Sequence, residues 1–322
     1  MPINLTNKNL HIAKTNKKDE FYTQLSDIEN ELKNYKKYFK NKVVLCNCDD
    51  PKISNFYRYF LNNFDALGLK KLIVSCYKNQ EVALFENKQS EPAIWLEYDG
   101  SKSSTHQFEG DGDFRSKEVV QLLEKVDIVI TNPPFSLFRE YVSQLIEYDK
   151  KFLIIGHQNA ITCKEIFRLF MENKLWLGYG FKGFAGYFIN TLYEDYATAT
   201  SRKEGTIRVA GVHWFTNLMI KKRHEDLILN SQYNLKTYPK YDNYDAIEVS
   251  KTKEIPVDYS GIMGVPITFL NKYSPKQFEI LGKTNSKEHA GQYLTGENPN
   301  AMINGKKLYH RILIKNKQLI KN

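Results

Sequence analysis

DIVITNPPFS, residues 127–136, is the stretch that decides the fold of this chain. Its apolar run, Ile128 to Ile130, predicts a short buried strand. Two consecutive prolines must end that strand, because each lacks a backbone N–H and neither can continue a sheet ladder. The stretch therefore predicts a rigid hook, Asn132 to Phe135, at the carboxyl end of a strand. Open α/β sheets bind their ligands at that edge.

The hook carries groups that suit a reaction at an aromatic amine. The lone pair of such an amine is delocalised into its ring, so the nitrogen is a poor nucleophile. Oxygen atoms that accept its two hydrogens draw the nitrogen towards tetrahedral geometry. The Asn132 side-chain oxygen and the Pro133 carbonyl oxygen provide two acceptors, and Phe135 offers a face on which a planar base stacks. The alternative is a loop breaker followed by a core phenylalanine, but two prolines directly after a clean strand favour the functional interpretation.

The composition sets limits on fold and compartment. A chain of 322 residues predicts about two domains of roughly 150 residues each. No apolar run reaches the roughly 18 residues of a membrane-spanning helix, so we expect no membrane association, and the amino terminus has no apolar signal-peptide region. The four cysteines match no disulfide or zinc pattern, so we expect reduced thiols in a cytoplasmic protein. The net charge of +9 favours a polyanionic partner, with lysine-rich solubility as the alternative.

Two segments resemble cofactor motifs of methyltransferases, and the hook itself resembles motif IV of the amino-methyltransferases, which use S-adenosylmethionine. DEFYTQ, residues 19–24, resembles motif X, a turn that holds the amino-acid end of the cofactor, and it precedes the first predicted strand as in that family. GDGDF, residues 110–114, resembles motif III, in which an acid meets the cofactor adenine and the aromatic residue packs beside it. A simple glycine–aspartate turn is the alternative for this second segment.

The first predicted strand, residues 42–48, runs into Asp49-Asp50-Pro51, where methyltransferases place their first cofactor loop. Either acid could hold the cofactor amino group or cap the following helix. Many members of the family have several glycines at this turn, whereas this chain has none between Lys42 and Leu67. The second predicted strand, residues 71–77, lacks the acid that commonly holds the cofactor ribose, so no residue is assigned to that role.

The resemblance implies two sets of site residues, carried over position by position. The catalytic set is Asn132, Pro133, Pro134 and Phe135. The cofactor-binding set is Phe21, Tyr22, Thr23, Asn47, Asp49, Asp50, Pro51, Asp113, Phe114 and Asn132. No His, Cys and Asp residues stand at ligand spacing, so we expect no metal site.

The chain divides by composition into three parts. Residues 1–18 are polar and basic and are predicted as a flexible arm, and residues 19–220 are predicted as the cofactor-binding and catalytic domain. That domain contains residues 180–205, a long connection that we interpret as a substrate-facing insertion. From Lys221 the composition shifts, and residues 221–322 are predicted as a target-recognition region.

The insertion lies between segments predicted as paired strands, residues 175–179 and 207–215. The residues predicted to contact DNA are Arg202, Lys203, Lys221, Lys222 and Arg223. Phosphate contacts by such residues set orientation and affinity, while contacts to base edges specify sequence. The alternative is a solvated basic cluster and a packed surface loop.

Taken together, the motifs resemble adenine-specific DNA methyltransferases of the EcoRI modification-methylase type, in the gamma motif order and over nearly the whole chain. The segments that carry the resemblance are 19–24, 43–51, 127–135 and 264–270. The family implies an α/β class I methyltransferase fold, with a Rossmann-like, mostly parallel seven-stranded sheet that ends in an antiparallel hairpin. It further implies a monomer that methylates N6 of a flipped-out adenine in double-stranded DNA. A stacked, paired amino group cannot enter a hook that holds both its hydrogens, so flipping is physically required.

Other functions remain open at this point. An RNA adenine methyltransferase, a protein-glutamine methyltransferase with its own Asn-Pro-Pro hook, and a non-catalytic nucleic-acid-binding protein are the alternatives. A cytosine-carbon methylase needs a cysteine nucleophile, usually after proline, and none of the four cysteines follows proline. The family suggests a short palindrome such as GAATTC as target, and a cognate restriction endonuclease that forms no stable complex with the methylase. The sequence itself gives neither.

Overall fold

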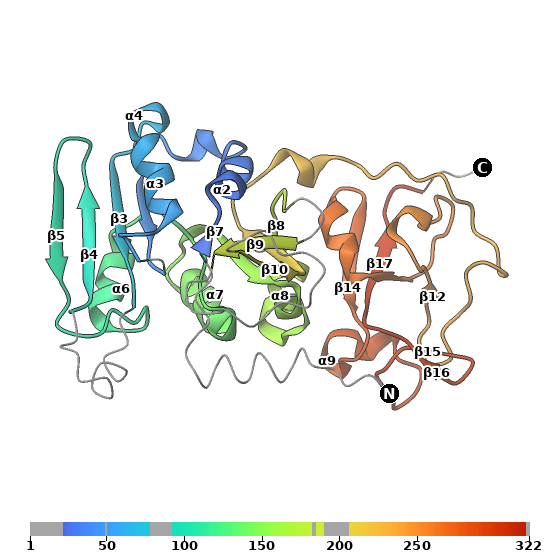
Figure 1. Ribbon diagram of the computed structural model, residues 1–322. Helices are drawn as coiled ribbons and strands as arrows, with labels where there is room; N and C mark the ends of the chain where they lie inside the picture. The colour runs from blue at the N-terminus through green and yellow to red at the C-terminus, as the bar shows by residue number, and fades with distance from the viewer. Residues whose placement is uncertain (1–21, 49, 78–91, 182–184, 190–205, 320–322) are drawn as a thin grey trace. The chain divides into compact units, whose positions relative to one another are not determined.

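The computed structural model describes residues 22–48, 50–77, 92–181, 185–189 and 206–319 (Figure 1). The chain forms two compact units, the first of residues 1–167 and 177–218 and the second of residues 168–176 and 219–322. The second unit therefore includes residues 168–176, which the sequence placed in the catalytic domain. No helix in the described part of the chain is long and apolar enough to cross a membrane.

The largest sheet has eight strands in the order β5-β4-β3-β2-β6-β7-β11-β8. Their bounds are β2 Val43–Cys46, β3 Lys71–Ser75, β4 Ile94–Tyr98, β5 Ser103–Gln107, β6 Ile128–Thr131, β7 Lys151–His157, β8 Trp176–Leu177 and β11 Val212–Thr216. Strands β3, β2, β6 and β7 are parallel, while β11 pairs antiparallel with β7. The sheet has eight strands where seven were predicted, because the antiparallel hairpin β4–β5 extends it beyond β3.

The predicted strand before the hook is confirmed as β6, and all four of its residues are buried. Its start is fixed to β2 by the Asp127 carboxylate, which accepts the Val43 N–H at 2.9 Å and pairs with the Lys42 ammonium at 2.9 Å. The parallel register then aligns Leu45 with Val129. Because the two strands run in the same direction, the loop after β2 and the hook after β6 leave the sheet at the same edge.

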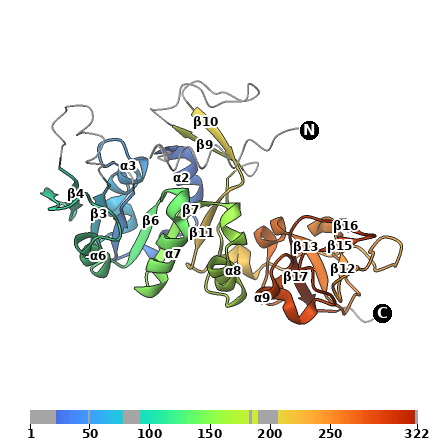
Figure 2. The same cartoon turned by 90° about the horizontal axis from the view of Figure 1, so that it is seen from below.

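Helices cover both sides of this sheet. They are α2 Leu25–Leu32, α3 Asn55–Asn62, α4 Phe64–Leu67, α6 Lys117–Glu124, α7 Phe138–Glu147 and α8 Lys164–Met171. Figure 2 shows α2 and α3 on one side of the strands and α6 and α7 on the other. Helix α6 begins where the Ser116 hydroxyl accepts the Val119 N–H, and its buried face carries Val119, Leu122 and Leu123. The connections β2–α3–β3 and β6–α7–β7 thus give a doubly wound arrangement, in which the direction of winding reverses between β2 and β6.

A second, three-stranded antiparallel sheet has the order β1-β9-β10, formed by Tyr22–Thr23, Ala185–Ile189 and Thr206–Ala210. The single strand predicted over residues 207–215 is wrong, because Gly211 takes a positive φ of 71° and separates β10 from β11. Strand β9 belongs to the predicted insertion and pairs with the segment that resembles motif X, with Thr23 opposite Phe188. The remainder of the insertion, which contains Arg202 and Lys203, lies outside the described residues.

A buried carboxylate on α2 holds the chain that follows β8. Glu31 is 1% exposed, and its two carboxylate oxygens accept the backbone N–H groups of Tyr179 at 2.8 Å and Gly180 at 2.9 Å. It also accepts the Tyr35 hydroxyl at 2.8 Å, and burial raises the pKa of that phenol well above its usual range. A Cβ at Gly178 would collide with Glu31 and Tyr35, so only glycine lets the chain pass this close.

Replacing Glu31 with glutamine should lower the free energy of unfolding by about 1–3 kcal/mol, because an amide nitrogen cannot accept the Gly180 N–H and leaves it without its partner. Urea denaturation followed by circular dichroism measures the loss. Glu29, exposed on the same helix, provides the control: Glu29→Gln should change the free energy of unfolding by no more than about 0.5 kcal/mol. Equal losses in the two variants would mean that the Glu31 carboxylate does not anchor this segment.

The second unit contains a mixed four-stranded sheet in the order β12-β13-β17-β14. Its strands are β12 Ile247–Glu248, β13 Met263–Pro266, β14 Phe278–Lys283 and β17 Arg311–Asn316, with the helix α9 Lys287–Ala290 beside them. A short hairpin, β15 Met302–Ile303 and β16 Lys306–Lys307, precedes β17. The side chains of Tyr241, Tyr244 and Leu313 belong to its core.

Candidate active site

The hook follows directly from β6 at the carboxyl edge of the parallel strands. Asn132 is 7% exposed and Pro133 is buried, whereas Phe135 is half-buried. Pro134 has φ −55° and ψ 126°, and its carbonyl accepts the Leu137 N–H at 3.0 Å, which starts the turn Phe135–Leu137 leading into α7. The two prolines therefore fix the backbone between a strand and a helix, as the sequence predicted.

The Phe135 ring forms one wall of a cavity of about 250 Å³. Residues at the end of β7 form the opposite wall, because β7 is the next parallel strand and ends at the same edge. The Phe135 and His157 ring centroids lie 6.3 Å apart at 48°. The cavity is lined by Phe135, Ser136, Phe138, Arg139, Glu140, His157, Asn159, Ala160 and Cys163.

His157 is a neutral component of this cavity. Its Nδ1 accepts the backbone N–H of Asn159 at 3.1 Å, and burial lowers the pKa of its imidazole. Both effects oppose protonation at neutral pH. His157 thus presents an aromatic, uncharged surface to the space beside Phe135.

The loop after β2 is joined to α7 through Tyr141, a residue that the sequence analysis did not assign to the site. Its buried hydroxyl donates to the Asn47 side-chain oxygen, and its ring packs edge-on against Phe114 with a centroid distance of 5.1 Å. Tyr141 therefore connects the segments that resemble the first cofactor loop and motif III. A tyrosine within an apolar helix stripe was the available signal, because a buried phenol requires a hydrogen-bond partner.

The remaining part of the first loop is a turn that leads into α3. The Asp50 carboxylate accepts the Lys52 N–H at 2.9 Å, and Pro51 is buried. The cap of α3 is Ser54, whose hydroxyl accepts the Tyr57 N–H at 3.2 Å, so Asp50 does not cap this helix. Two other residues of the predicted cofactor set, Phe21 and Asp49, lie outside the described residues.

Asp113 is held by its neighbour in the sequence. Its carboxylate accepts Arg115 Nε at 2.8 Å and Arg115 Nη2 at 2.7 Å, and these hydrogen bonds lower the pKa of Asp113. The predicted contact with the cofactor adenine therefore requires Asp113 to accept a further hydrogen bond at a remaining lone pair.

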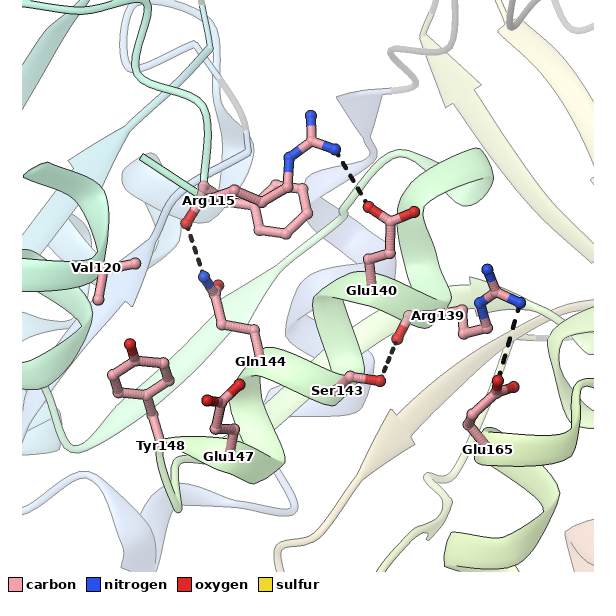
Figure 3. A pocket seen from close by; sticks show the side chains of 10 residues that line it. Arg115, Val120, Arg139, Glu140, Ser143, Gln144, Glu147, Tyr148 and Glu165 are labelled. Carbon is pink, nitrogen blue, oxygen red and sulfur yellow. Dashed lines mark hydrogen bonds and ion pairs between the residues drawn. The ribbon is translucent and has the colours of Figure 1, made fainter. Parts of the chain in front are cut away.

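A second cavity, of about 520 Å³, lies on the outer side of α7 (Figure 3). Two ion pairs lie in its lining: Arg115 with Glu140 at 3.2 Å, and Arg139 with Glu165 at 4.0 Å. The Gln144 amide donates to the Phe114 carbonyl at 2.9 Å. The contacts of Arg115 and Gln144 hold the segment that resembles motif III on α7.

Three buried hydroxyls near the carboxyl edge have no hydrogen-bond partner within the described part of the chain. They belong to Thr23 in β1, Ser75 at the end of β3 and Thr131 at the end of β6. Thr23 is tied to the start of α3, because its carbonyl accepts the Asn55 amide at 2.8 Å. Buried polar atoms are nearly always satisfied in folded proteins, so these hydroxyls are suited to a polar ligand at this edge. The described residues contain no group of three or more His, Cys, Asp or Glu side chains that could hold a metal ion.

The predicted DNA contacts in the second unit differ in their exposure. Lys221 is exposed and Lys222 is half-buried. Arg223 is 6% exposed, with its guanidinium 4.0 Å from the Trp176 ring centroid and hydrogen bonded to Asn173. The prediction that Arg223 presents its charge to DNA is therefore corrected. Its guanidinium is packed inside the second unit, and burial lowers its pKa.

Comparison with known proteins gives a consistent result. Residues 9–317 match the family model described as adenine-specific methyltransferase EcoRI. The chain is 51% identical to the type II methyltransferase M.EcoRI of Escherichia coli, and the alignment covers 100% of both chains. It is 41% identical to the type II methyltransferase M.MgeORF184P of Mycoplasma genitalium, over 95% of this chain and 98% of that one. It is 40% identical to the type II methyltransferase M.MpnI of Mycoplasma pneumoniae, over 95% and 97%. No solved structure matches the chain significantly.

Proposed function

Because the chain belongs to the EcoRI family of adenine-specific methyltransferases, we propose that it is the DNA methylase of a restriction-modification system. It transfers a methyl group from S-adenosylmethionine to N6 of a flipped-out adenine in double-stranded DNA. The observation that carries the proposal is the hook itself: the buried Asn132 directly follows β6, and Phe135 of the same hook lines a cavity.

The carboxyl edge of the sheet fits the cofactor. S-adenosylmethionine, when bound, supplies a methyl group from its positively charged sulfur. The rest of the cofactor is then a neutral thioether and a good leaving group. The three buried hydroxyls of Thr23, Ser75 and Thr131 supply polar groups for such a ligand. The other residues proposed to hold it are Phe21, Tyr22, Asn47, Asp49, Asp50, Pro51, Asp113, Phe114 and Asn132. We further propose that the sheet is a class I methyltransferase sheet with the hairpin β4–β5 at one edge.

The hook activates the adenine amine. The Asn132 side-chain oxygen and the Pro133 carbonyl oxygen accept the two amino hydrogens, so electron density on the nitrogen rises as it attacks. Bound S-adenosylmethionine would supply the methyl group to this nitrogen, and the methylated amine would give up one proton to solvent water. Phe135 stacks on the base, and Pro134 keeps the two acceptor oxygens in place. These oxygens therefore need little rearrangement as the reaction proceeds.

DNA binding is supported by the distribution of charge along the chain. Residues 219–322 hold 17 Lys and Arg against 10 Asp and Glu, an excess of seven, whereas residues 1–218 hold 29 against 27, an excess of two. A basic surface attracts the phosphate backbone irrespective of sequence. We therefore propose residues 221–322 as the main DNA-binding part, with Lys221 and Lys222 at phosphates and with Arg202 and Lys203 of the insertion as further DNA contacts.

Methyl transfer from tritiated S-adenosylmethionine tests the proposal. Label should enter duplex DNA and be recovered as N6-methyladenine, and sequencing of modified adenines should locate one short recognition site. Label in RNA or in a protein glutamine instead would identify one of the other hook-bearing enzymes. Binding of DNA without transfer would leave a non-catalytic nucleic-acid-binding protein.

Replacing Phe135 with alanine should weaken capture of the flipped adenine by about 1–3 kcal/mol, the value of a base stacked on an aromatic ring. A fluorescent base analogue at the target position reports the captured state, and its signal in the protein–DNA complex should fall. Phe135→Tyr keeps the ring and provides the matched control, with most of the signal retained. Unchanged signal and rate in the alanine variant would make Phe135 a packing residue.

A further inference from the structure

The hairpin β15–β16 in the second unit has a rigidly held tip. Asn304 and Gly305 take positive φ values of 51° and 71°, as a two-residue hairpin turn of the type Asn-Gly requires. The Asp242 carboxylate accepts both of their backbone N–H groups, at 3.1 Å and 2.8 Å. The tip therefore has a defined conformation in the absence of a partner.

The inward side of the same hairpin is anchored on the core of the second unit. Ile303 and Leu308 pack against the buried cluster that contains Tyr241, Tyr244 and Leu313. The Met302 N–H is also held by the Asn243 side-chain oxygen at 3.1 Å. A surface built on such a support presents its outward side chains in a fixed place, which lowers the entropy cost of binding.

The outward side chains combine a bare aromatic ring with positive charge. Tyr309 is 86% exposed, the largest exposed fraction among the large apolar side chains of the described residues. Lys306 and Lys307 are both exposed. An aromatic ring that remains in water does not stabilise the fold, because the hydrophobic contribution to stability comes from burial.

Positive charge predominates in this part of the chain, although the Asp242 carboxylate lies at the hairpin tip. Residues 298–322 contain six Lys and Arg and no Asp or Glu. Within this segment Arg311 is paired with Glu248 at 2.6 Å, so the lysines provide the free charge. Partial burial and the neighbouring Lys283 and Lys307 lower the pKa of His310, which is the response expected of a histidine in a positive potential.

We propose that this tyrosine hairpin, residues 302–310, is a DNA-contacting element, in which Lys306 and Lys307 bind phosphates and Tyr309 packs against a base or deoxyribose. The inference rests on the proposed function and adds a named contact surface to it. Interleaved cations and an aromatic ring match nucleic acid, whose backbone is anionic and whose bases have stacking faces. A protein-binding surface would instead need a contiguous apolar patch, whereas the apolar neighbour of Tyr309 in the sequence, Leu308, packs against the core.

A salt titration of full-length protein on a short fluorescent duplex of random sequence tests the phosphate contacts. Lys306→Gln with Lys307→Gln should flatten the slope of log affinity against log salt by about 1.8, or about 0.9 for each lost contact. Lys272→Gln with Lys276→Gln is the matched control, because these lysines are also exposed on the second unit, and its slope should remain that of the wild type. An unchanged slope in the first double variant, or equal flattening in both, would overturn the proposal.

Substitution of the ring tests the stacking contact. Tyr309→Ala should weaken binding of the same duplex roughly 5- to 150-fold, while Tyr309→Phe should retain most of the affinity. Ile228→Ala is the control, because Ile228 is 81% exposed but lies outside the hairpin and follows the acidic pair Glu225 and Asp226; it should bind as the wild type does. Thermal unfolding of all three variants should match the wild type. If Tyr309→Ala leaves DNA affinity intact and instead abolishes self-association in sedimentation experiments, the hairpin contacts a second copy and the proposal fails.

Failure of this inference and failure of the proposed function give different results. If the wild type methylates adenine in duplex DNA but the hairpin variants bind and methylate as it does, only the hairpin assignment falls. If the wild type transfers no methyl group to DNA, the proposed function falls whatever the variants do.

Discussion

Replacing Asn132 with alanine should lower the rate of methyl transfer about 10²–10³-fold, the loss measured when one oriented polar group that acts in a transition state is removed. Asn132 is buried directly after β6, so no other side chain can move in to replace its oxygen. Single-turnover transfer to duplex DNA under saturating cofactor measures the chemical step apart from binding. The affinity for cofactor and the thermal unfolding temperature should change little.

Asn159→Ala provides the comparison for this variant. Asn159 lines the same cavity but is exposed and lies outside the hook, so its loss should reduce the rate far less than the loss of Asn132. Near wild-type turnover in Asn132→Ala, or equal rate losses in the two variants, would show that the hook has no direct role in methyl transfer.

Replacing Glu248 with alanine should lower the free energy of unfolding by about 3–5 kcal/mol, because it leaves the Arg311 charge without its partner in a low-dielectric environment. The two side chains are only 6% and 15% exposed. Arg311 Nη2 and Nε donate to the Glu248 carboxylate at 2.6 Å and 3.0 Å, and the buried Tyr241 hydroxyl donates to the same group. Urea denaturation of the full chain measures the difference.

An exposed ion pair in the same unit separates burial from charge. Glu254 pairs with Lys251 at 3.0 Å, but the two side chains are 35% and 65% exposed, so Glu254→Ala should cost no more than about 1 kcal/mol. Combining Glu248→Ala with Arg311→Met should recover much of the loss, because the double variant no longer buries an unpaired charge. If Glu248→Ala and Glu254→Ala cost the same, the Glu248–Arg311 pair is not buried in solution.

The sequence by itself determined the strand and hook, because both follow from local chemistry. A strand formed by an apolar run must end where two consecutive prolines follow it, whatever the tertiary surroundings. The structure accordingly has β6 at Ile128–Thr131 and the turn into α7 at Phe135–Leu137. Strand β17, Arg311–Asn316, likewise contains a local apolar run, residues 312–314, and all three of these residues are buried.

Only the tertiary structure decided which side chains those elements bring together. The local sequence predicts Arg223 as one cation of a basic cluster. In the structure, the ring of Trp176 packs on its guanidinium from a segment distant in the sequence, and the side chain is buried. Tyr141 reads as one residue of an apolar stripe, yet the parallel register of β2 with β6 places Asn47 within reach of its hydroxyl. Local patterns report the chain's own preferences over a few residues, whereas burial and hydrogen bonding of a polar side chain depend on partners that are remote in sequence. For that reason ten residues were enough to predict the hook, whereas the hydrogen bonds and side-chain packing around it could not be predicted from the sequence.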